Sequence, residues 1–251
     1  MKTLRTSDIA RAAGIHPNTV RQYEELGFLP RAERAANGYR QFTQRHLDQV
    51  LLVRRLAWCS WLGGMIHTRA YDAVMWSAAG DLDGALAAAR DLVKLVLAER
   101  AKAEQAVTLL EQWVAGGLPE AARQGAMNIK EAAAWLAVTP DMLRNWDRNG
   151  LLDVSRDPSS GYRVYGPAEL QRLLVIRALR RSRYTLMAIL TMFRRLEADR
   201  GADPRVALDT LPPGEADIFY STDRWLSKVK EIEGYAREAV QRLEEMARRY
   251  S

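Results

Sequence analysis

Four polar side chains follow a proline near the N-terminus and could hydrogen-bond to DNA. They are Asn18, Thr19, Arg21 and Gln22. Amide, hydroxyl and guanidinium groups are those that read base edges in the major groove or hold the phosphates beside it. A helix that begins at Pro17 would present them from its first turns, because proline is tolerated at the first helical position. The stretch therefore indicates a nucleic-acid recognition helix.

The same pattern returns 123 residues later, without a gap, from Pro17 to Ile66 of the first copy. The tripeptide Gly38-Tyr39-Arg40 has its counterpart in Gly161-Tyr162-Arg163. A period this long excludes a solenoid of short repeats and indicates a duplicated domain. Further aligned pairs are Pro17 with Pro140, Arg21 with Arg144, Tyr23 with Trp146, Glu24 with Asp147, Gly27 with Gly150, and Phe42 with Tyr165.

Local signals in the first copy predict two short helices joined by a tight turn. Thr6 or Ser7 is expected to cap a helix that Gly14 ends. Pro17 begins a second helix, which stops at Gly27. Two short helices separated by three or four residues form a helix-turn-helix unit. The second copy repeats the unit over residues 129–150, with Thr139 as the cap of its second helix.

A small β-hairpin, or wing, is expected after each of these units. The apolar pairs Phe28-Leu29 and Leu151-Leu152 are the candidates for its first strand. A polar loop that closes on glycine leads to a second strand, and a third, leucine-rich helix starts near Thr43 or Gly166.

Together these residues resemble the MerR family of transcription regulators. The family pattern Arg-x-Tyr-Glu-x-x-Gly-x-Leu followed by Asn-Gly-Tyr-Arg-x-Phe/Tyr is met closely by residues 19–29 and 37–42. It is met more loosely by residues 143–152 and 160–165, where Trp146 replaces the tyrosine and Asp147 the glutamate. The resemblance covers residues 3–70 and 127–195.

The resemblance implies which side chains contact DNA. Arg21 and Tyr23 would do so from the recognition helix, and Tyr39 and Arg40 from the wing. A purely structural role is the alternative for the arginines, and packing of helix against wing is the alternative for Tyr23 and Trp146. With the groups read directly from the first helix, the candidate DNA-binding residues are Asn18, Thr19, Arg21, Gln22, Tyr23, Tyr39, Arg40, Arg144, Asn145, Trp146, Tyr162 and Arg163.

Charge is distributed as two DNA-binding modules would require. Residues 1–58 carry 10 Lys/Arg and 5 Asp/Glu, and residues 127–197 carry 12 and 7, so each block has a net charge of +5. The whole chain has +6, which leaves 6 − 10 = −4 for the remainder. Two basic blocks in an acidic body are typical of modules that meet phosphate. Two solvated basic faces without a partner are the alternative.

The rest of the composition favours a soluble cytoplasmic protein. There is no apolar run of membrane-spanning length and no signal peptide, so no membrane partner is expected. Cys59 is the only cysteine, which excludes an intrachain disulfide and a thiolate-rich metal site. Trp58 and Trp61 beside it indicate core packing. His16, His46 and His67 have no spacing that suggests a site, so neither a metal nor another cofactor is expected.

The chain divides into four segments and a mainly α fold with small β wings. We expect a winged helix-turn-helix domain in 1–78, a long helix and linker in 79–126, a second winged domain in 127–200, and a connector with a C-terminal long helix in 201–251. The long helices, near 81–114 and 222–250, carry apolar stripes of coiled-coil spacing, and Gly116-Gly117-Leu118-Pro119 breaks the first. The second stripe comprises Trp225, Val229, Ile232, Ala236, Ala239, Leu243 and Met246.

MerR-type regulators are homodimers whose long helices pair antiparallel. This chain has two winged helix-turn-helix domains, which we call readers, and two such helices. They favour a monomeric pseudo-dimer with an intramolecular antiparallel pair, and an ordinary homodimer with four readers is the alternative. Since the two recognition helices differ, the half-sites should differ too. Asp141, where the first copy has Asn18, predicts weaker or more selective reading by the second copy.

No catalytic constellation is present, so the sequence predicts a regulator and not an enzyme. The resemblance implies binding to double-stranded promoter DNA, distortion of an overlong spacer, and RNA polymerase as a partner. The aromatic segments 61–76 and 203–225 leave open a pocket for an apolar small-molecule effector. An architectural, excisionase-like DNA-bending protein and a drug-sequestering protein are the alternatives.

Overall fold

The computed structural model describes residues 3–116, 125–199, 201–209 and 224–250. They form two compact units that do not coincide with the two halves of the sequence. Unit 1 contains residues 1–98 and 230–251, and unit 2 contains residues 99–229. No helix among the described residues is long and apolar enough to cross a membrane.

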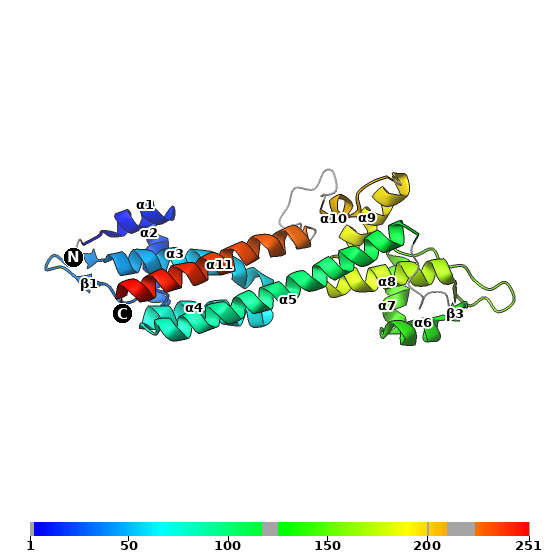
Figure 1. The fold of residues 1–251 in the computed structure, drawn as a ribbon, viewed down its shortest axis with the longest axis horizontal. Helices are drawn as coiled ribbons and strands as arrows, with labels where there is room; N and C mark the ends of the chain where they lie inside the picture. The colour runs from blue at the N-terminus through cyan, green and yellow to red at the C-terminus, as the bar shows by residue number, and fades with distance from the viewer. Residues whose placement is uncertain (1–2, 117–124, 200, 210–223, 251) are drawn as a thin grey trace. The chain divides into compact units, whose positions relative to one another are not determined.

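Unit 1 is built around the first repeat (Figure 1). Its elements are α1 (Thr6–Ala13), α2 (Pro17–Glu25), β1 (Glu33–Arg34), β2 (Arg40–Gln41), α3 (Gln44–Cys59), the 3-10 turn η1 (Ser60–Leu62), α4 (Gly64–Ala79) and the first part of α5 (Leu82–Val114). The two helices of the helix-turn-helix and the third helix therefore form where the sequence predicts them. Beyond residue 229, α11 (Trp225–Tyr250) completes the unit.

Unit 2 repeats this order with the second copy. Its elements are the second part of α5, β3 (Met127–Asn128), α6 (Ile129–Leu136), α7 (Pro140–Arg148), β4 (Val164–Tyr165), α8 (Pro167–Arg181), α9 (Leu186–Ala198), α10 (Pro204–Asp209) and the start of α11. The β3–β4 pair joins Met127 to Tyr165. In unit 1, a single bridge joins Leu4 to Phe42, the residues equivalent to Met127 and Tyr165.

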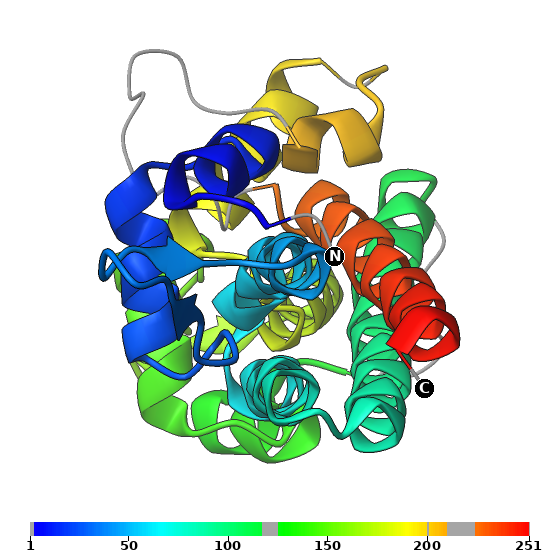
Figure 2. The same cartoon turned by 90° about the vertical axis from the view of Figure 1, so that its left-hand side faces the viewer.

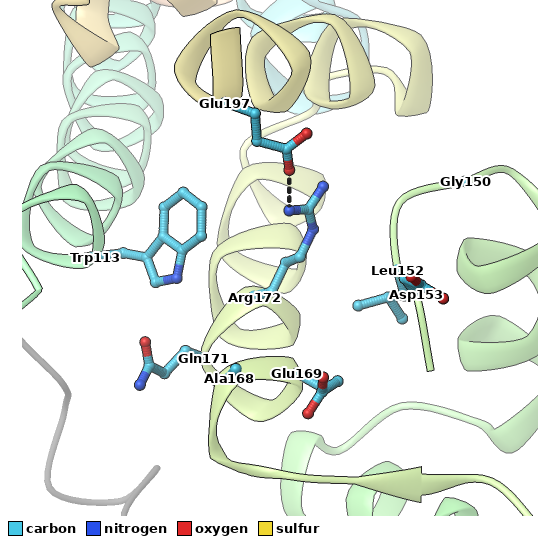
Figure 3. Close-up of a pocket in the computed structure, with 9 residues that line it drawn as sticks. All are labelled: Trp113, Gly150, Leu152, Asp153, Ala168, Glu169, Gln171, Arg172 and Glu197. Carbon is cyan, nitrogen blue, oxygen red and sulfur yellow. Dashed lines mark hydrogen bonds and ion pairs between the residues drawn. The ribbon is translucent and has the colours of Figure 1, made fainter. Parts of the chain in front are cut away.

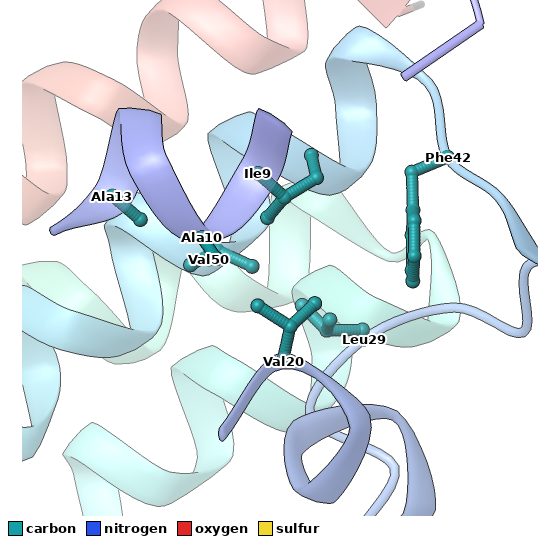
Figure 4. Packing of buried hydrophobic residues seen from close by; sticks show 7 residues of the cluster. All are labelled: Ile9, Ala10, Ala13, Val20, Leu29, Phe42 and Val50. Carbon is teal, nitrogen blue, oxygen red and sulfur yellow. The ribbon is translucent and has the colours of Figure 1, made fainter. Parts of the chain in front are cut away.

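The core of the first reader lies between α1, α2, the wing and α3 (Figure 4). Burial is complete for Ile9, Val20 and Phe42, and Leu29 is 3% exposed. Apolar burial of this kind is the main stabilising term of a small domain. The seven buried members of the cluster are Ile9, Ala10, Ala13, Val20, Leu29, Phe42 and Val50.

Two local predictions are wrong. Phe28-Leu29 and Leu151-Leu152 are not strands. The amide N–H groups of Phe28 and Leu29 both donate to the carbonyl of Tyr23, so this segment closes the end of α2. The first wing strand follows at Glu33–Arg34 and pairs antiparallel with Arg40–Gln41. The cap of α1 is also misplaced: the helix starts one residue after Arg5, whose amide N–H donates to Asp8.

The gapless alignment hides a local shift between the wings. In unit 1 the amide of Ala35 donates to the carbonyl of Tyr39, four residues on. In unit 2 the amide of Asp157 donates to the carbonyl of Tyr162, five residues on. The arms of the second wing are joined by a single bridge between Arg156 and Arg163 instead of paired strands. This wing has one more residue in its tip and one fewer before the bridge.

The predicted long helices exist, and their apolar stripes are buried. The α5 helix starts at Leu82, one residue from the predicted start, and all seven stripe residues of α11 are at most 2% exposed. Within unit 1, α11 runs antiparallel beside α5 and along α3 (Figures 1 and 2). Ion pairs join Arg90 to Glu244 and Arg55 to Glu238. The α5 helix ends at Val114, as predicted, and Gly116 lies in the turn that follows. The rest of the predicted break, 117–119, and the predicted start at Thr222 lie outside the described residues.

The turns between the first two helices of each reader differ in one testable way. Gly14 has φ 62°, and its counterpart Ala137 adopts φ 49°. The left-handed region costs an L-residue about 1–2 kcal/mol, a cost that glycine does not have.

We expect Ala137→Gly to stabilise unit 2 by about 0.5–1 kcal/mol, because relief of strain exceeds the added freedom of the unfolded chain. The midpoint of urea denaturation measures this. As a matched control, Ala134→Gly lies inside α6 and should destabilise by about 0.5–1 kcal/mol. Destabilisation of equal size in both variants would contradict the strained turn.

Candidate nucleic-acid interface

The recognition helix of unit 1, α2, presents polar groups from its first turn. Pro17 occupies the first helical position, and the His16 ring nitrogen Nδ1 accepts the amide N–H of Asn18. Arg21 and Gln22 are exposed, and Thr19 is half-buried. The guanidinium of Arg21 donates to the side-chain oxygen of Asn18 at 2.9 Å. The helix therefore holds its arginine in place one turn beyond its start.

The recognition helix of unit 2, α7, repeats this contact with a charged partner. Arg144 donates to Asp141 at 2.5 Å, and both side chains are at least half exposed. Thr139 caps the helix by accepting the amide N–H of Met142, as the sequence predicts. Asn145 is exposed, and its side-chain oxygen accepts from Asn149 at 3.0 Å. The acidic partner leaves less free positive charge on this helix.

An ion pair ties the wing of unit 1 to the last turn of α2. The Arg40 Nε atom lies 2.5 Å from the Glu24 carboxylate, with the two side chains 22% and 11% exposed. The other Glu24 oxygen accepts the amide N–H of Ala32 at 2.9 Å. Glu24 thus fixes both the wing strand and the chain that leads into it.

Unit 2 has the same clamp one repeat later. Arg163 places Nε 2.8 Å and Nη2 2.6 Å from one oxygen of Asp147. The two side chains are 27% and 18% exposed. We call the pairs Glu24–Arg40 and Asp147–Arg163 the wing clamps. In the described structure, Arg40 and Arg163 therefore have a structural partner at the sites predicted to contact DNA.

The aromatic candidates fall into two groups. Tyr39 and Tyr162 are 74% and 75% exposed at the two wings. Tyr23 is half-buried against the core of the first reader, with its ring 6.0 Å from that of Phe28. Trp146 is only 2% exposed. The packing alternative therefore describes the placement of Trp146, and we leave it out of the interface.

A groove separates the recognition helix from the wing in each unit. The groove of unit 1 has a volume of about 870 Å³, and that of unit 2 about 700 Å³. Arg21 and Tyr39 line the first, and their counterparts Arg144 and Tyr162 line the second. In the first groove Arg5, Arg21 and Arg40 give +3 without an acidic residue. In the second, Lys130, Arg144, Arg156 and Arg163 against Asp157 give 4 − 1 = +3.

Sequence reasoning missed four cations near these grooves: Arg5, Arg34, Lys130 and Arg156. Arg5 and Lys130 line the grooves from the start of the first helix of each reader. Arg34 donates to the carbonyl of Gly38 at 3.2 Å, and Arg156 donates to that of Gly161 at 3.0 Å. Both bonds brace a wing. No sequence motif marks Arg5 or Lys130, whereas Arg34 and Arg156 lie in the polar loops before Gly38 and Gly161, which the sequence does single out.

The wing tips are held by different side chains. In unit 1 the Asn37 side chain accepts the amide N–H of Tyr39 at 3.2 Å. In unit 2 the Asp157 carboxylate accepts the amide and hydroxyl groups of both Ser159 and Ser160, at 2.5 to 3.0 Å. The hydroxyl of Ser159 contributes most to lowering the pKa of Asp157 to about 2, so the carboxylate stays ionised at neutral pH.

The remaining titratable candidates do not form a metal site. Among the described residues, no group of three or more His, Cys, Asp or Glu side chains is arranged to hold a metal ion. Burial raises the pKa of the Cys59 thiol to about 12, which leaves it protonated. Burial also lowers the pKa of His46, whose ring packs edge-on against Phe42.

In comparison with known proteins, each repeat matches a model of MerR-type regulatory proteins. The model of the MerR family regulatory protein matches residues 5–42, and that of the MerR HTH family regulatory protein matches residues 127–196. A mercuric resistance operon regulatory protein of Bacillus cereus is 35% identical over 52 residues, which are 21% of this chain and 39% of the relative.

Two further relatives are similar over the same extent. The HTH-type transcriptional regulator CueR of Escherichia coli O157:H7 is 38% identical over 52 residues, 21% of this chain and 38% of the relative. CueR of Vibrio cholerae serotype O1 is 36% identical over 52 residues, 21% of this chain and 37% of the relative. The chain thus spans less than half the length of the curated relatives it matches. No solved structure matches the chain significantly.

The wing clamp of unit 1 can be tested directly. Glu24→Gln removes the charge that holds Arg40, and loss of a hydrogen bond to a charged group costs about 1.5–3 kcal/mol. We expect the amide of Ala35, which closes the wing hairpin, to exchange with solvent roughly ten to a hundred times faster. Amide hydrogen exchange measures this. The control is Glu25→Gln, a change at the exposed neighbouring residue, and equal exchange in both variants would refute the clamp.

Proposed function

Since this chain belongs to the MerR family and carries two MerR-type domains, we propose that it is a transcription regulator whose two readers bind double-stranded promoter DNA as one pseudo-dimer. The observation that carries the proposal is the pair of equivalent basic grooves, each between a recognition helix and a wing. Grooves lined by basic side chains at equivalent positions of both repeats favour two DNA-binding domains over one such domain and a degenerate copy.

Each reader offers a positioning contact and a reading surface. Arg21 or Arg144 and the exposed wing tyrosine are placed to hold phosphates on the two sides of a groove. Asn18, Gln22 and Asn145 are the exposed amides left to meet base edges. Asp141 both restrains Arg144 and repels phosphate, so the second half-site should be bound more weakly or more selectively. The wing clamps position the tyrosines.

The exchange of long helices supports the pseudo-dimer. Unit 1 combines the first reader with the helix that follows the second reader, and unit 2 combines the second reader with the second part of the helix that follows the first. Two separate chains of a homodimer would exchange helices in the same manner. Here the two long helices belong to one chain, and the apolar stripe of α11 is buried without a second chain. This favours one chain, not two, as the species that binds DNA.

In this proposal the pseudo-dimer distorts the spacer of a promoter so that RNA polymerase engages both promoter elements. The cost of bending depends on sequence and is offset by the contacts of the two readers. No catalytic role is part of the proposal. An architectural DNA-bending protein, one of the alternatives from the sequence, would bind DNA through the same grooves but would show no promoter-spacer preference.

Arg21→Ala and Arg144→Ala test the two readers separately. Each variant should bind promoter DNA more weakly, and the slope of log K against log salt should become shallower by about 0.9, because one phosphate contact is lost. Fluorescence anisotropy over a salt series measures both quantities. Arg248→Ala is the control, since Arg248 is exposed near the end of α11 and lines neither groove. Unchanged affinity and slope in either reader variant would remove that residue from the interface.

A further inference from the structure

Unit 2 contains a hollow whose lining shares no residue with the groove between α7 and the wing. It has a volume of about 460 Å³ and lies between the end of α5, the segment after α7, and helices α8 and α9 (Figure 3). Pockets for small molecules have volumes of about 300–1,000 Å³. The lining residues are Trp113, Gly150, Leu152, Asp153, Ala168, Glu169, Gln171, Arg172 and Glu197.

The first repeat has an arginine at the position equivalent to Ala168, which lines the hollow. Ala168 is the counterpart of Arg45, 123 residues earlier. In unit 1 the side chain of Arg45 reaches Gly80 at the end of α4, and its Nε atom is buried. Its guanidinium carbon lies 5.9 Å from the centre of the Tyr250 ring. Unit 1 therefore holds a guanidinium of its own against an aromatic ring at the end of a long helix.

Unit 2 has an aromatic ring here but no counterpart of the Arg45 guanidinium, since position 168 is alanine. Trp113 and Tyr250 both lie at the C-terminal end of a long helix: Trp113 is the penultimate residue of α5, and Tyr250 is the last residue of α11. Its indole packs edge-on against Phe193, with ring centres 5.3 Å apart, and Arg172 lies 3.8 Å above the ring of Phe193. Trp113 therefore packs against Phe193 at the edge of the hollow. At position 168 the side chain ends in a methyl group, which leaves the hollow beside it.

The charge of the hollow favours a cation. Three carboxylates, Asp153, Glu169 and Glu197, line it with one guanidinium, so the formal charge of the lining is 1 − 3 = −2. Glu197 pairs with Arg172 at 2.5 Å, and Glu169 accepts the amide N–H of Gly166 at 2.9 Å. Asp153 is exposed on the segment after α7. A cation above an indole and beside carboxylates is stabilised by both.

We propose that this hollow binds a small planar organic cation, of the amidinium or guanidinium class, stacked on Trp113. Such a ligand would stand where the first repeat places Arg45. Because the site lies within unit 2, the proposal does not depend on DNA binding, and its failure would leave the proposed function unaffected.

Benzamidine is the probe, and benzamide, of the same shape but uncharged, is its matched control ligand. Calorimetric titration of the full chain without DNA should show one benzamidine bound per chain, with a dissociation constant of about 1 mM or tighter. Benzamide should bind at least about tenfold more weakly, because it carries no charge for the carboxylates to stabilise.

Two variants locate the site. Ala168→Arg rebuilds the corner of the first repeat and should weaken benzamidine binding at least about tenfold, and Asp153→Asn should weaken it severalfold. Both positions are exposed, so neither change disturbs the core. The control Ala134→Arg adds the same charge on the surface of α6 and should bind as the unchanged chain does. Absence of saturable binding, equal binding of the two ligands, or full binding by Ala168→Arg would overturn the proposal.

Discussion

The wing clamp is the interaction on which the rest of each reader depends. A hairpin of two-residue strands is too short to hold a fixed position by its own hydrogen bonds. In both repeats, a carboxylate in the last turn of the recognition helix binds an arginine of the wing, at 2.5 Å for Arg40 in β2 and at 2.6 Å for Arg163, which forms a single bridge with Arg156. The partners are largely shielded from water, which strengthens the attraction relative to a surface pair. The groove with its exposed tyrosine exists because this pair fixes one wall against the other.

A second constraint is the buried seam of α11. Its seven stripe residues are at most 2% exposed, and a single helix cannot bury such a face by itself. Within unit 1 the seam packs beside α3 and α5, and the end of the helix is fixed where Arg249 and Tyr250 both donate to Asp48, at 2.8 and 2.6 Å. The last residues of the second repeat thus stabilise the first reader. This arrangement is the physical basis of the pseudo-dimer that we propose.

Much of the fold could be predicted from the sequence because its signals are local. Pro17, Pro140, Gly14 and Thr139 mark helix ends through backbone geometry, and those helices begin and end there. The predicted strand at Phe28-Leu29 is wrong because Leu29 is buried in the core and the ring of Phe28 packs near those of Tyr23 and Tyr71. A short apolar pair does not distinguish such packing from a strand. The gapless alignment does not reveal the one-residue shift between the wings, because the second wing has one residue fewer before it and one residue more in its tip.

The candidate site could be predicted by position but not by role. Arg40 and Arg163 line the two grooves, but their ion pairs involve residues 16 positions away, which no local pattern reveals. Trp146 aligns with Tyr23, yet one is buried and the other half-buried. The hollow of unit 2 depends on one difference between the repeats, which is arginine at position 45 and alanine at position 168. The sequence shows this difference, but only the structure shows that it leaves space beside Ala168.

The central claim is that one chain supplies both readers of one DNA site. The most direct measurement is to select bound duplexes from a random pool and then to weigh the complex of chain and selected duplex by native mass spectrometry. The account predicts two dissimilar half-sites at a fixed spacing and one chain per duplex. A palindromic site occupied by two chains would contradict it.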